Sequence, residues 1–267
     1  MRNFLKNLRQ HLRELYEYKY LISTFVTRDF KARFRQAKLG ISWAIVQPLF
    51  MTVVFTVVFS RLLKVSTDGA PYPVFSFVAL SVWTFFSRSV TAGSVSLIYN
   101  GGLVKKVYFP REVIPISTVI SSLVDFGIAS LITILFLLIY SIGISWHVVL
   151  LPLVLLIQVL LGLAITMSTA SLTVVFRDLE FAFPFFVQLL MYASPIIYSI
   201  RNLQQPYKNL LYLNPITGIV EGYRSILIYH ELPNLWLLGV SLGFAMIILV
   251  ISYVLFKRIE RYMADVL

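Results

Sequence analysis

The sequence predicts an all-α polytopic membrane protein, and its composition, its hydropathy and its series of apolar stretches carry that prediction. Of the 267 residues, 58% are hydrophobic and 13% are charged, whereas a soluble domain has about 25% charged residues. The mean hydropathy of +0.83 points the same way. A water-soluble core of this size could not bury so much apolar surface, so we expect the bilayer to be the solvent for most of the chain.

Six stretches are apolar and long enough to be membrane spans, because about 20 helical residues cross the hydrocarbon layer. Only a helix satisfies its own backbone hydrogen bonds in contact with lipid, so all six transmembrane segments are expected to be helical. The expected spans are 41–62, 73–98, 113–141, 147–175, 181–200 and 235–256.

The first 40 residues precede the spans and form a segment distinct from the transmembrane domain of residues 41–267. We expect a cytoplasmic amphipathic helix in the membrane interface, because apolar and basic side chains recur on separate helical faces. The apolar faces hold Leu5, Leu8, Leu12 and Leu15, and then Val26, Phe30, Phe34 and Ala37. The basic stripe consists of Arg28, Lys31, Arg35 and Lys38. The chain then turns into the membrane at Gly40, and this long amphipathic start is unlike a cleaved signal peptide.

Positive charge is distributed unevenly, and the asymmetry predicts the orientation of the chain. Ten of the 23 Lys and Arg residues lie in residues 1–40. With the N-terminus in the cytoplasm, cytoplasmic segments hold 17 basic residues and the opposite segments hold five, with Arg88 inside a span. Because basic residues are enriched on the cytoplasmic side, both termini are expected there. The net charge of +11 therefore indicates an anionic membrane surface and not a nucleic acid partner.

Residues 201–234 are too apolar for an ordinary loop and too interrupted for a span. Asn214 and Pro215 form a helix start, with an N-cap and a proline at the first helical position. Glu221 and Arg224 stand three residues apart and can pair on one helix face. We expect two short helices that re-enter the outer leaflet between the fifth and sixth spans, and an interfacial amphipathic loop is the alternative.

Arg88 and Asp125 are the only ionisable residues deep inside the expected spans. The helical rise of 1.5 Å per residue places them at similar depths in the second and third spans. An unpaired charge at that depth is unfavourable by several kcal/mol, so a pair between them is the natural hypothesis. The pair could contact a substrate or ion, or it could hold two neighbouring helices together.

Small polar and aromatic side chains along the spans have two interpretations. In the second span, Ser87, Ser89, Thr91, Ser94 and Ser96 favour close helix packing or could line a hydrated path. Aromatic residues could anchor the spans at the interface, or they could line a path for sugars, because aromatic faces stack on sugar rings without demanding charge. The candidates for such a lining are Phe55, Phe59, Trp83, Phe86, Tyr192 and Tyr198.

The chain carries no recognisable catalytic or metal-binding motif. It has no cysteine, and its three histidines are scattered with no metal-ligand spacing. It also lacks both G-x-S-x-G and the phosphate-binding pattern G-x-x-x-x-G-K-[ST]. We therefore expect a transport subunit that is not itself an enzyme and holds no metal, with energy supplied by a partner or an ion gradient.

The connection between the second and third spans, residues 99–117, is longer than a plain loop needs. Asn100, Gly101 and Gly102 form a turn, a short basic and apolar segment follows, and Pro110 interrupts it. A small helix here could dock on a soluble partner, and a basic topogenic loop is the alternative.

At this connection the sequence resembles a known family, the membrane subunits of type-2 ABC exporters, especially the Wzm-type permeases that export O-antigen and related polysaccharides. Within the loop the resemblance is carried by KKVYFPREVIPIS at 105–117. Elsewhere it is carried by FKARFRQAKLGISWAIVQP at 30–48, FRDLE at 176–180, SPIIYS at 194–199 and NP at 214–215. The order and spacing of these motifs agree with the six expected spans.

The resemblance implies a homodimer of this chain with two separate ATPase subunits, which would hold ATP and Mg while this chain holds no cofactor. ATP binding would move the contact elements and pass a lipid-linked polysaccharide outward across the inner membrane. The residues implied to contact the ATPase are Leu103, Lys105, Lys106, Tyr108, Arg111, Glu112, Arg177, Asp178 and Glu180. Those implied to form an outer gate are Pro195, Asn214, Pro215, Glu221 and Arg224.

Other functions remain open at the level of the sequence. An ABC exporter of teichoic acid, capsule or small lipophilic molecules would share the same motifs. An ion-coupled transporter would show inverted repeats and paired ionisable groups at mid-membrane. An intramembrane enzyme would need a convergent set of catalytic groups, and the sequence shows none.

Overall fold

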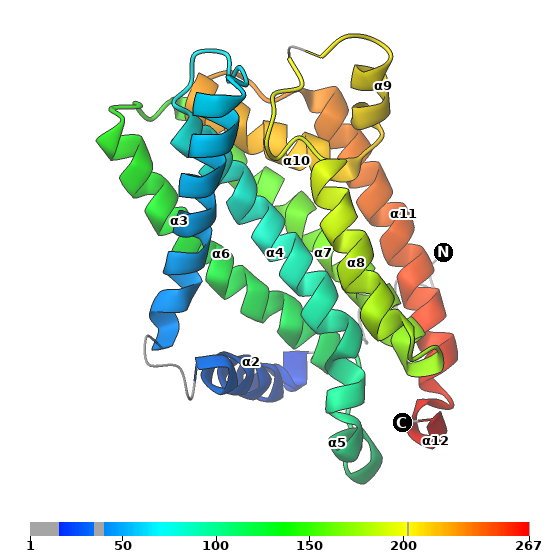
Figure 1. Ribbon diagram of the computed structural model, residues 1–267. Coiled ribbons are helices and arrows are strands. Elements are labelled where there is room, and N and C mark those ends of the chain that lie inside the picture. The colour runs from blue at the N-terminus through cyan, green and yellow to red at the C-terminus, as the bar shows by residue number, and fades with distance from the viewer. Residues whose placement is uncertain (1–15, 35–39, 202, 267) are drawn as a thin grey trace.

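The long apolar stretches of the sequence become the long helices of a bundle (Figure 1). The computed structural model describes residues 16–34, 40–201 and 203–266, and every regular element in that part of the chain is helical. Within it, five helices are long and apolar enough to cross a membrane. They are α3 (Trp43–Phe55) continued by η2 (Thr56–Leu62), α4 (Tyr72–Tyr99), α6 (Val113–Ile139), η3 (Trp146–Leu150) continued by α7 (Leu151–Val175), and α11 (Leu235–Glu260).

The fifth expected span is shorter than predicted. Helix α8 (Leu179–Tyr192) has 14 residues, and the chain then continues through turns to Ile200. The prediction of a helix over 181–200 is therefore wrong beyond Tyr192. Pro195 explains the break, because it cannot donate a backbone hydrogen bond and its ring would clash with the carbonyl of the preceding turn. At 1.5 Å per residue α8 is about 21 Å long, less than the hydrocarbon thickness.

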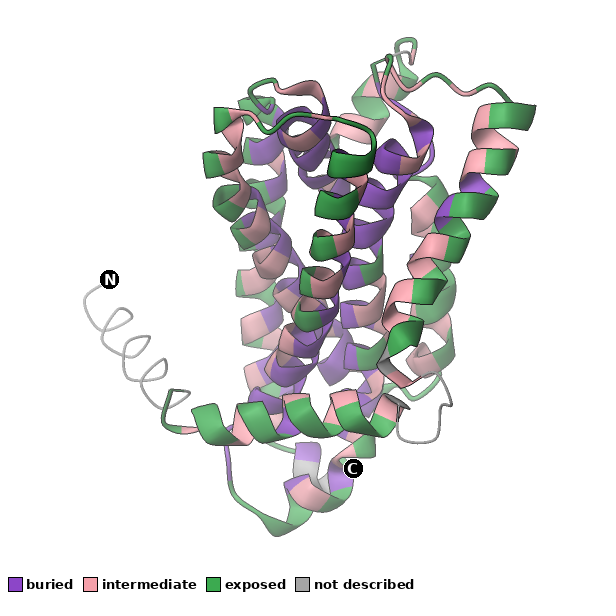
Figure 2. Cartoon of the chain, turned by 90° about the vertical axis from the view of Figure 1, so that its left-hand side faces the viewer, coloured by how far each residue is buried: buried purple, intermediate pink, exposed green. Residues whose placement is uncertain are grey.

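Helix α4 is the centre of the bundle and packs against α3, α6, α7 and α8. Most of its side chains are buried, including Phe75, Phe77 and Phe85. Helices α4 and α7 approach closely at Gly162 of α7. A Cβ at Gly162 would lie 2.9 Å from the ring of Phe85 on α4, so the ring occupies the space that a side chain would need. The buried residues therefore run through the middle of the bundle, with exposed residues on the outer helices (Figure 2).

Helix α2 (Lys19–Phe34) crosses the base of the bundle, at the end that also carries α5 (Gly101–Lys106) and α12 (Met263–Val266) (Figures 1 and 2). The prediction of a helix before the first span is confirmed for these residues, and Gly40 turns the chain upward with a φ of +52°. The centre of the inward face is Phe25, whose ring lies 6.3 Å from that of Phe109. Helix α2 therefore packs against the rest of the protein through its buried face. The predicted faces at residues 1–15 and 35–39 lie outside the described residues.

Short helices close the opposite end of the bundle (Figure 1). They are α9 (Tyr207–Tyr212) and α10 (Pro215–Arg224), the latter continued by η4 (Ser225–Tyr229). Helix α10 is almost completely buried, and it approaches α11 closely at Gly218, where a Cβ would lie 2.4 Å from the Leu237 carbonyl oxygen. The two predicted short helices are thus present.

Candidate functional site

A cavity of about 560 Å³ lies between α3, α4, α6 and α8. Two tryptophans, Trp43 and Trp83, contribute aromatic surface to its wall, and polar groups come from Gln47, Thr84 and Ser87. The combination of flat aromatic faces and small polar groups suits the stacking and hydrogen bonding of a sugar ring. The charged side chains that line this cavity lie together in one group.

The charged side chains in the wall of this cavity are Arg33, Arg88 and Asp125. They form an ionic cluster, which we call the arginine–aspartate cluster. Arg33 donates from Nη1 to both carboxylate oxygens of Asp125, at 3.0 Å and 3.2 Å, and from Nη2 to Ser121 Oγ at 3.4 Å. Arg88 also donates from Nη1 to Asp125 Oδ2. One carboxylate from α6 is therefore shared by guanidinium groups from α2 and α4.

The structure thus brings Arg88 and Asp125 into contact, as the matched depths in the sequence suggested. Arg33 was not expected at this site. It is separated from Asp125 by 92 positions and belongs to a helix whose basic residues were assigned to the membrane surface. No local pattern in the sequence signals the contact, because it depends on how α2 folds back beneath the bundle.

A second cavity, of about 640 Å³, lies on the other side of the cluster between α2, α4 and α6. Arg33 and Arg88 line both cavities, so the arginine–aspartate cluster stands where the two meet. Burial lowers the pKa of the Arg33 guanidinium, while the nearby carboxylates of Asp125 and Asp29 act to raise it. We call this second cavity the lower cavity and the first one the upper cavity. The lining of the lower cavity is mostly apolar and includes the polar side chains of Tyr99, Asn100 and Thr118.

The six aromatic candidates do not gather around one path within a single copy of the chain. Phe55 and Phe59 pack edge to face in the hydrophobic core, with ring centroids 5.5 Å apart. Trp83 faces the cavity that holds the cluster, whereas Phe86 and Tyr198 line a different cavity near α10. Tyr192 is exposed at the end of α8.

Most of the expected ATPase-contacting residues lie together at the base of the bundle. Lys105, Lys106 and Tyr108 are exposed on and after α5, and Tyr108 is 92% exposed; Leu103 of α5 is half-buried. Arg177 and Asp178 are exposed in the turn before α8. The two segments are tied together by the Tyr99 hydroxyl, which donates to Glu180 Oε1 at 3.0 Å.

Arg111 and Glu112 differ from this group. Glu112 is 1% exposed and its Oε1 pairs with Nζ of Lys257 on α11 at 2.8 Å. Arg111 is half-buried and donates to the backbone carbonyl of Glu260. These two side chains hold the connecting loop against α11, and the coupling of Arg111 and Glu112 to an ATPase stays a prediction.

Residues 193–200, which follow α8 and are not helical, form what we call the unwound segment. At the opposite end from the base, Arg224 of α10 is fully buried and organises this segment. Its guanidinium donates to the carbonyl oxygens of Pro195 at 2.6 Å and Ile196 at 2.9 Å. It pairs with Glu221 Oε1 at 3.0 Å, as the spacing predicts, and it lies 3.5 Å from the centroid of the Phe75 ring. The carbonyls that the broken helix leaves without helical partners are thus bonded to a charged donor.

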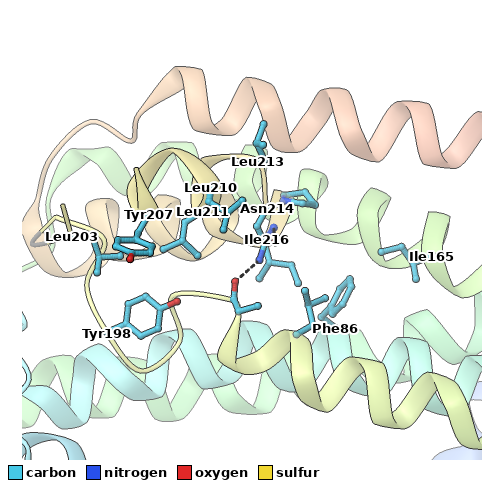
Figure 3. Close-up of a pocket in the computed structure, with 13 residues that line it drawn as sticks. Phe86, Ile165, Tyr198, Leu203, Tyr207, Leu210, Leu211, Leu213, Asn214 and Ile216 are labelled. Carbon is cyan, nitrogen blue, oxygen red and sulfur yellow. Dashed lines mark hydrogen bonds between the residues drawn. The ribbon is translucent and has the colours of Figure 1, made fainter. Parts of the chain in front are cut away.

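Asn214 joins the same segment to the start of α10. Its side-chain oxygen accepts from Ile216 N at 3.0 Å, which confirms the predicted N-cap, and Pro215 occupies the first helical position. Its Nδ2 donates to the Ala193 carbonyl oxygen at 3.0 Å (Figure 3). The same Nδ2 donates to Ser194 Oγ at 2.9 Å. The expected gate residues therefore form one connected unit of α8, the unwound segment and α10.

Beside this unit is a largely apolar cavity of about 680 Å³, shown in Figure 3. Residues of α9 such as Tyr207 and Leu210 cover one side of it, while Phe86 and Ile165 lie on the other. Helix α9 therefore covers this cavity beside the junction of α8 and α10.

Contacts between the loops at this end were not expected from the sequence. Ser199 Oγ donates to Asp68 Oδ2 at 2.6 Å, and Arg201 pairs with Glu231 at 2.5 Å. The hydrogen bond to Glu231 raises the pKa of Arg201. Among the described residues, no group of three or more His, Cys, Asp or Glu side chains could hold a metal ion.

Comparison with known proteins agrees with this arrangement. A family model described as ABC-2 type transporter matches residues 20–228. The chain is 33% identical over 225 residues to the O-antigen export system permease protein RfbA of Myxococcus xanthus, covering 84% of this chain and 86% of the relative. It is 26% identical to a permease of the same name from Klebsiella pneumoniae and 26% identical to the polysialic acid transport protein KpsM of Escherichia coli. Each of these matches covers 92% of this chain and 95% of the relative.

Proposed function

The chain belongs to the ABC-2 type transporter family, and from that premise we propose that it is the transmembrane subunit of an ATP-driven polysaccharide exporter. It would move a lipid-linked polysaccharide from the cytoplasmic to the outer side of the inner membrane. The observation that carries the proposal is similarity along almost the whole length of relatives named for O-antigen export and polysialic acid transport. The relatives named for polysialic acid transport make a polymer of that kind the second candidate cargo.

The topology we propose has six crossings, with α8 and the unwound segment together as the fifth. Two features support it. The base, which carries α2 and α5, coincides with the basic segments of the sequence, and this favours a cytoplasmic base with both termini there. The bonding of Pro195 and Ile196 to Arg224 supplies the partners that non-helical backbone requires at membrane depth, so a re-entrant α9–α10 unit is physically admissible.

The energy would come from separate ATPase subunits, two of them beneath a homodimer of this chain. The exposed part of α5 and the turn at Arg177 and Asp178 are the proposed contact surface. The hydrogen bond between Tyr99 and Glu180 would make the two segments move together. Movement at this surface would reach α11 through the Glu112–Lys257 pair and α6 through the short loop that follows α5.

The test is purification of the tagged chain from its native membrane in mild detergent, with the bound proteins identified by mass spectrometry. We expect a stoichiometric partner that contains a phosphate-binding loop. The double variant Lys105→Glu, Lys106→Glu should reduce the recovered partner by at least about tenfold, because reversed charge at an interface is unfavourable by several kcal/mol.

The matched control is Lys64→Glu, an exposed lysine at the opposite end of the bundle. All of these lysines are exposed, so the thermal unfolding of the isolated chain should change little in any variant. Recovery of no ATPase in several mild detergents would overturn the proposal. Equal loss in the Lys64→Glu variant would show that α5 is not the contact surface.

A further inference from the structure

The arginine–aspartate cluster contains more positive than negative charge. Two guanidinium groups meet one carboxylate, and all three side chains are largely withdrawn from solvent, with 27% exposure for Arg33, 24% for Arg88 and 10% for Asp125. Asp125 can neutralise one arginine. A second carboxylate, that of Asp29, lies near Arg33, but it pairs with Arg28 at 3.0 Å, so the three arginines that line the two cavities outnumber the two carboxylates.

The cluster also stands at a junction. Arg33 and Arg88 line the lower cavity beside α2 and the upper cavity between α3 and α4. A ligand that extends from one cavity into the other must pass both guanidinium groups. Since α2 is the helix expected at the membrane interface, the junction is at the level where the phosphate groups of lipids lie.

The residues that line the two cavities indicate which part of a ligand would lie next to the arginine–aspartate cluster. The upper cavity offers Trp43, Trp83 and small polar groups, which suit a sugar. Neutral sugars would not need a buried excess of positive charge. A phosphate or diphosphate does, because guanidinium groups bind phosphate oxygens through paired charge-assisted hydrogen bonds.

We propose that Arg33 and Arg88 bind the phosphate or diphosphate group that joins the lipid to the glycan. Asp125 occupies their donors when no substrate is bound and keeps both side chains in position. The bound headgroup replaces Asp125 as the acceptor, which would also loosen α2 from α6. This inference rests on the proposed function, because it names the part of a lipid-linked substrate that this site recognises.

The experiment measures binding of a polyprenyl diphosphate to the full chain in nanodiscs of zwitterionic lipid, with polyprenol and inorganic diphosphate as comparison probes. We expect polyprenyl diphosphate to bind at least about tenfold more tightly than polyprenol, and inorganic diphosphate to compete with it weakly. Arg33→Gln and Arg88→Gln should each weaken binding by about tenfold or more, since each removes a charge-assisted contact.

Two variants distinguish direct binding of the phosphate group by the arginines from a purely structural role of the cluster. Lys31→Gln removes a positive charge from the exposed face of the same helix and should leave binding unchanged. Asp125→Asn frees both guanidinium groups and should leave binding as tight as, or tighter than, in the unaltered chain. If the cluster were only a structural ion pair, Asp125→Asn would weaken binding as much as Arg33→Gln does.

Thermal unfolding without ligand shows whether a variant is folded. Where Arg33→Gln fails that check, Arg33→Lys replaces it and should weaken binding severalfold by loss of the paired donors. Equal affinity for polyprenol and polyprenyl diphosphate overturns the proposal, as does equal affinity for inorganic diphosphate, which would indicate a free-anion site. The recovery of the ATPase partner is independent of these readouts, so the exporter proposal can stand when this one fails.

Discussion

Arg224 donates a hydrogen bond of 2.6 Å to the carbonyl oxygen of Pro195, and this contact fixes the segment at which α8 stops being a helix. The same guanidinium bonds Ile196 O and pairs with Glu221. Its side chain is fully buried. A single side chain of α10 therefore supplies bonds that a continuous helix would have made within its own backbone.

Arg224→Gln should destabilise the protein strongly. It leaves Glu221 buried without its cation and removes the donor of several carbonyls, and breaking a buried pair in this way costs about 3–5 kcal/mol. The measurement is the thermal unfolding midpoint in detergent. Arg201→Gln is the control, because the Arg201–Glu231 pair is partly exposed and contributes only about 0–1 kcal/mol. Similar losses in both variants would contradict the role given to Arg224.

Asn214→Ala should cost more than an ordinary N-cap substitution. It removes the cap of α10, worth about 1 kcal/mol, and two further hydrogen bonds to Ala193 and Ser194, each worth about 1 kcal/mol. Asn234→Ala removes only the cap of α11, which bonds Trp236 N and Leu237 N. Denaturant or thermal unfolding should therefore show a larger loss for Asn214→Ala, and equal losses would argue against the link to α8.

Gly218→Ala should separate α10 from α11. The added Cβ would lie 2.3 Å from Ser241 Oγ and 2.4 Å from the Leu237 carbonyl oxygen. The α11 backbone at Leu237 would have to shift to relieve this clash, which is unfavourable in free energy. Overpacking of this kind costs about 1–3 kcal/mol. Gly239→Ala on α11 meets no atom within 4 Å and should be neutral or slightly stabilising, because alanine favours helix. Unfolding midpoints that fall in both variants, or in neither, would contradict the close approach.

Lys257→Met should destabilise the loop that follows α5, because Glu112 would remain as a buried carboxylate without its cation. The expected loss is about 1–3 kcal/mol, reduced by the partial exposure of Lys257. The double variant Glu112→Gln, Lys257→Met removes both charges and should recover part of the loss. Hydrogen exchange of residues 107–112 measures the effect locally. A double variant that is less stable than Lys257→Met would show that the pair does not act as described.

Features that depend on a few neighbouring residues were predictable. The N-cap at Asn214 with Pro215 beside it, the Glu221–Arg224 pair and the turn at Gly40 all follow from spacings of four residues or fewer. The five long spans follow from hydropathy, which is additive along a window. The helix end at Tyr192 was missed because the apolar stretch continues past it, although Pro195 gave a local signal.

Features of the site that depend on distant contacts were not predictable. Arg33 meets Asp125 only because Phe25 docks α2 beneath the bundle, and Lys257 meets Glu112 only because α11 returns to the base. In the sequence, Arg33 stands outside the basic stripe that holds Lys31, but this position does not identify Asp125 as its partner. The proposed headgroup site could therefore not be assembled from motifs.

The sequence by itself determined that this chain is a helical membrane protein, where most of its spans lie, and which family its motifs resemble. These properties follow from transfer free energies and backbone preferences that each segment carries with it. Tertiary structure alone decided that Arg33 joins Arg88 and Asp125 and that Lys257 pairs with Glu112. Two guanidinium groups converge on Asp125, and Arg224 replaces the missing helical bonds after α8, because burial leaves each charged or polar group only the partners that packing brings within reach.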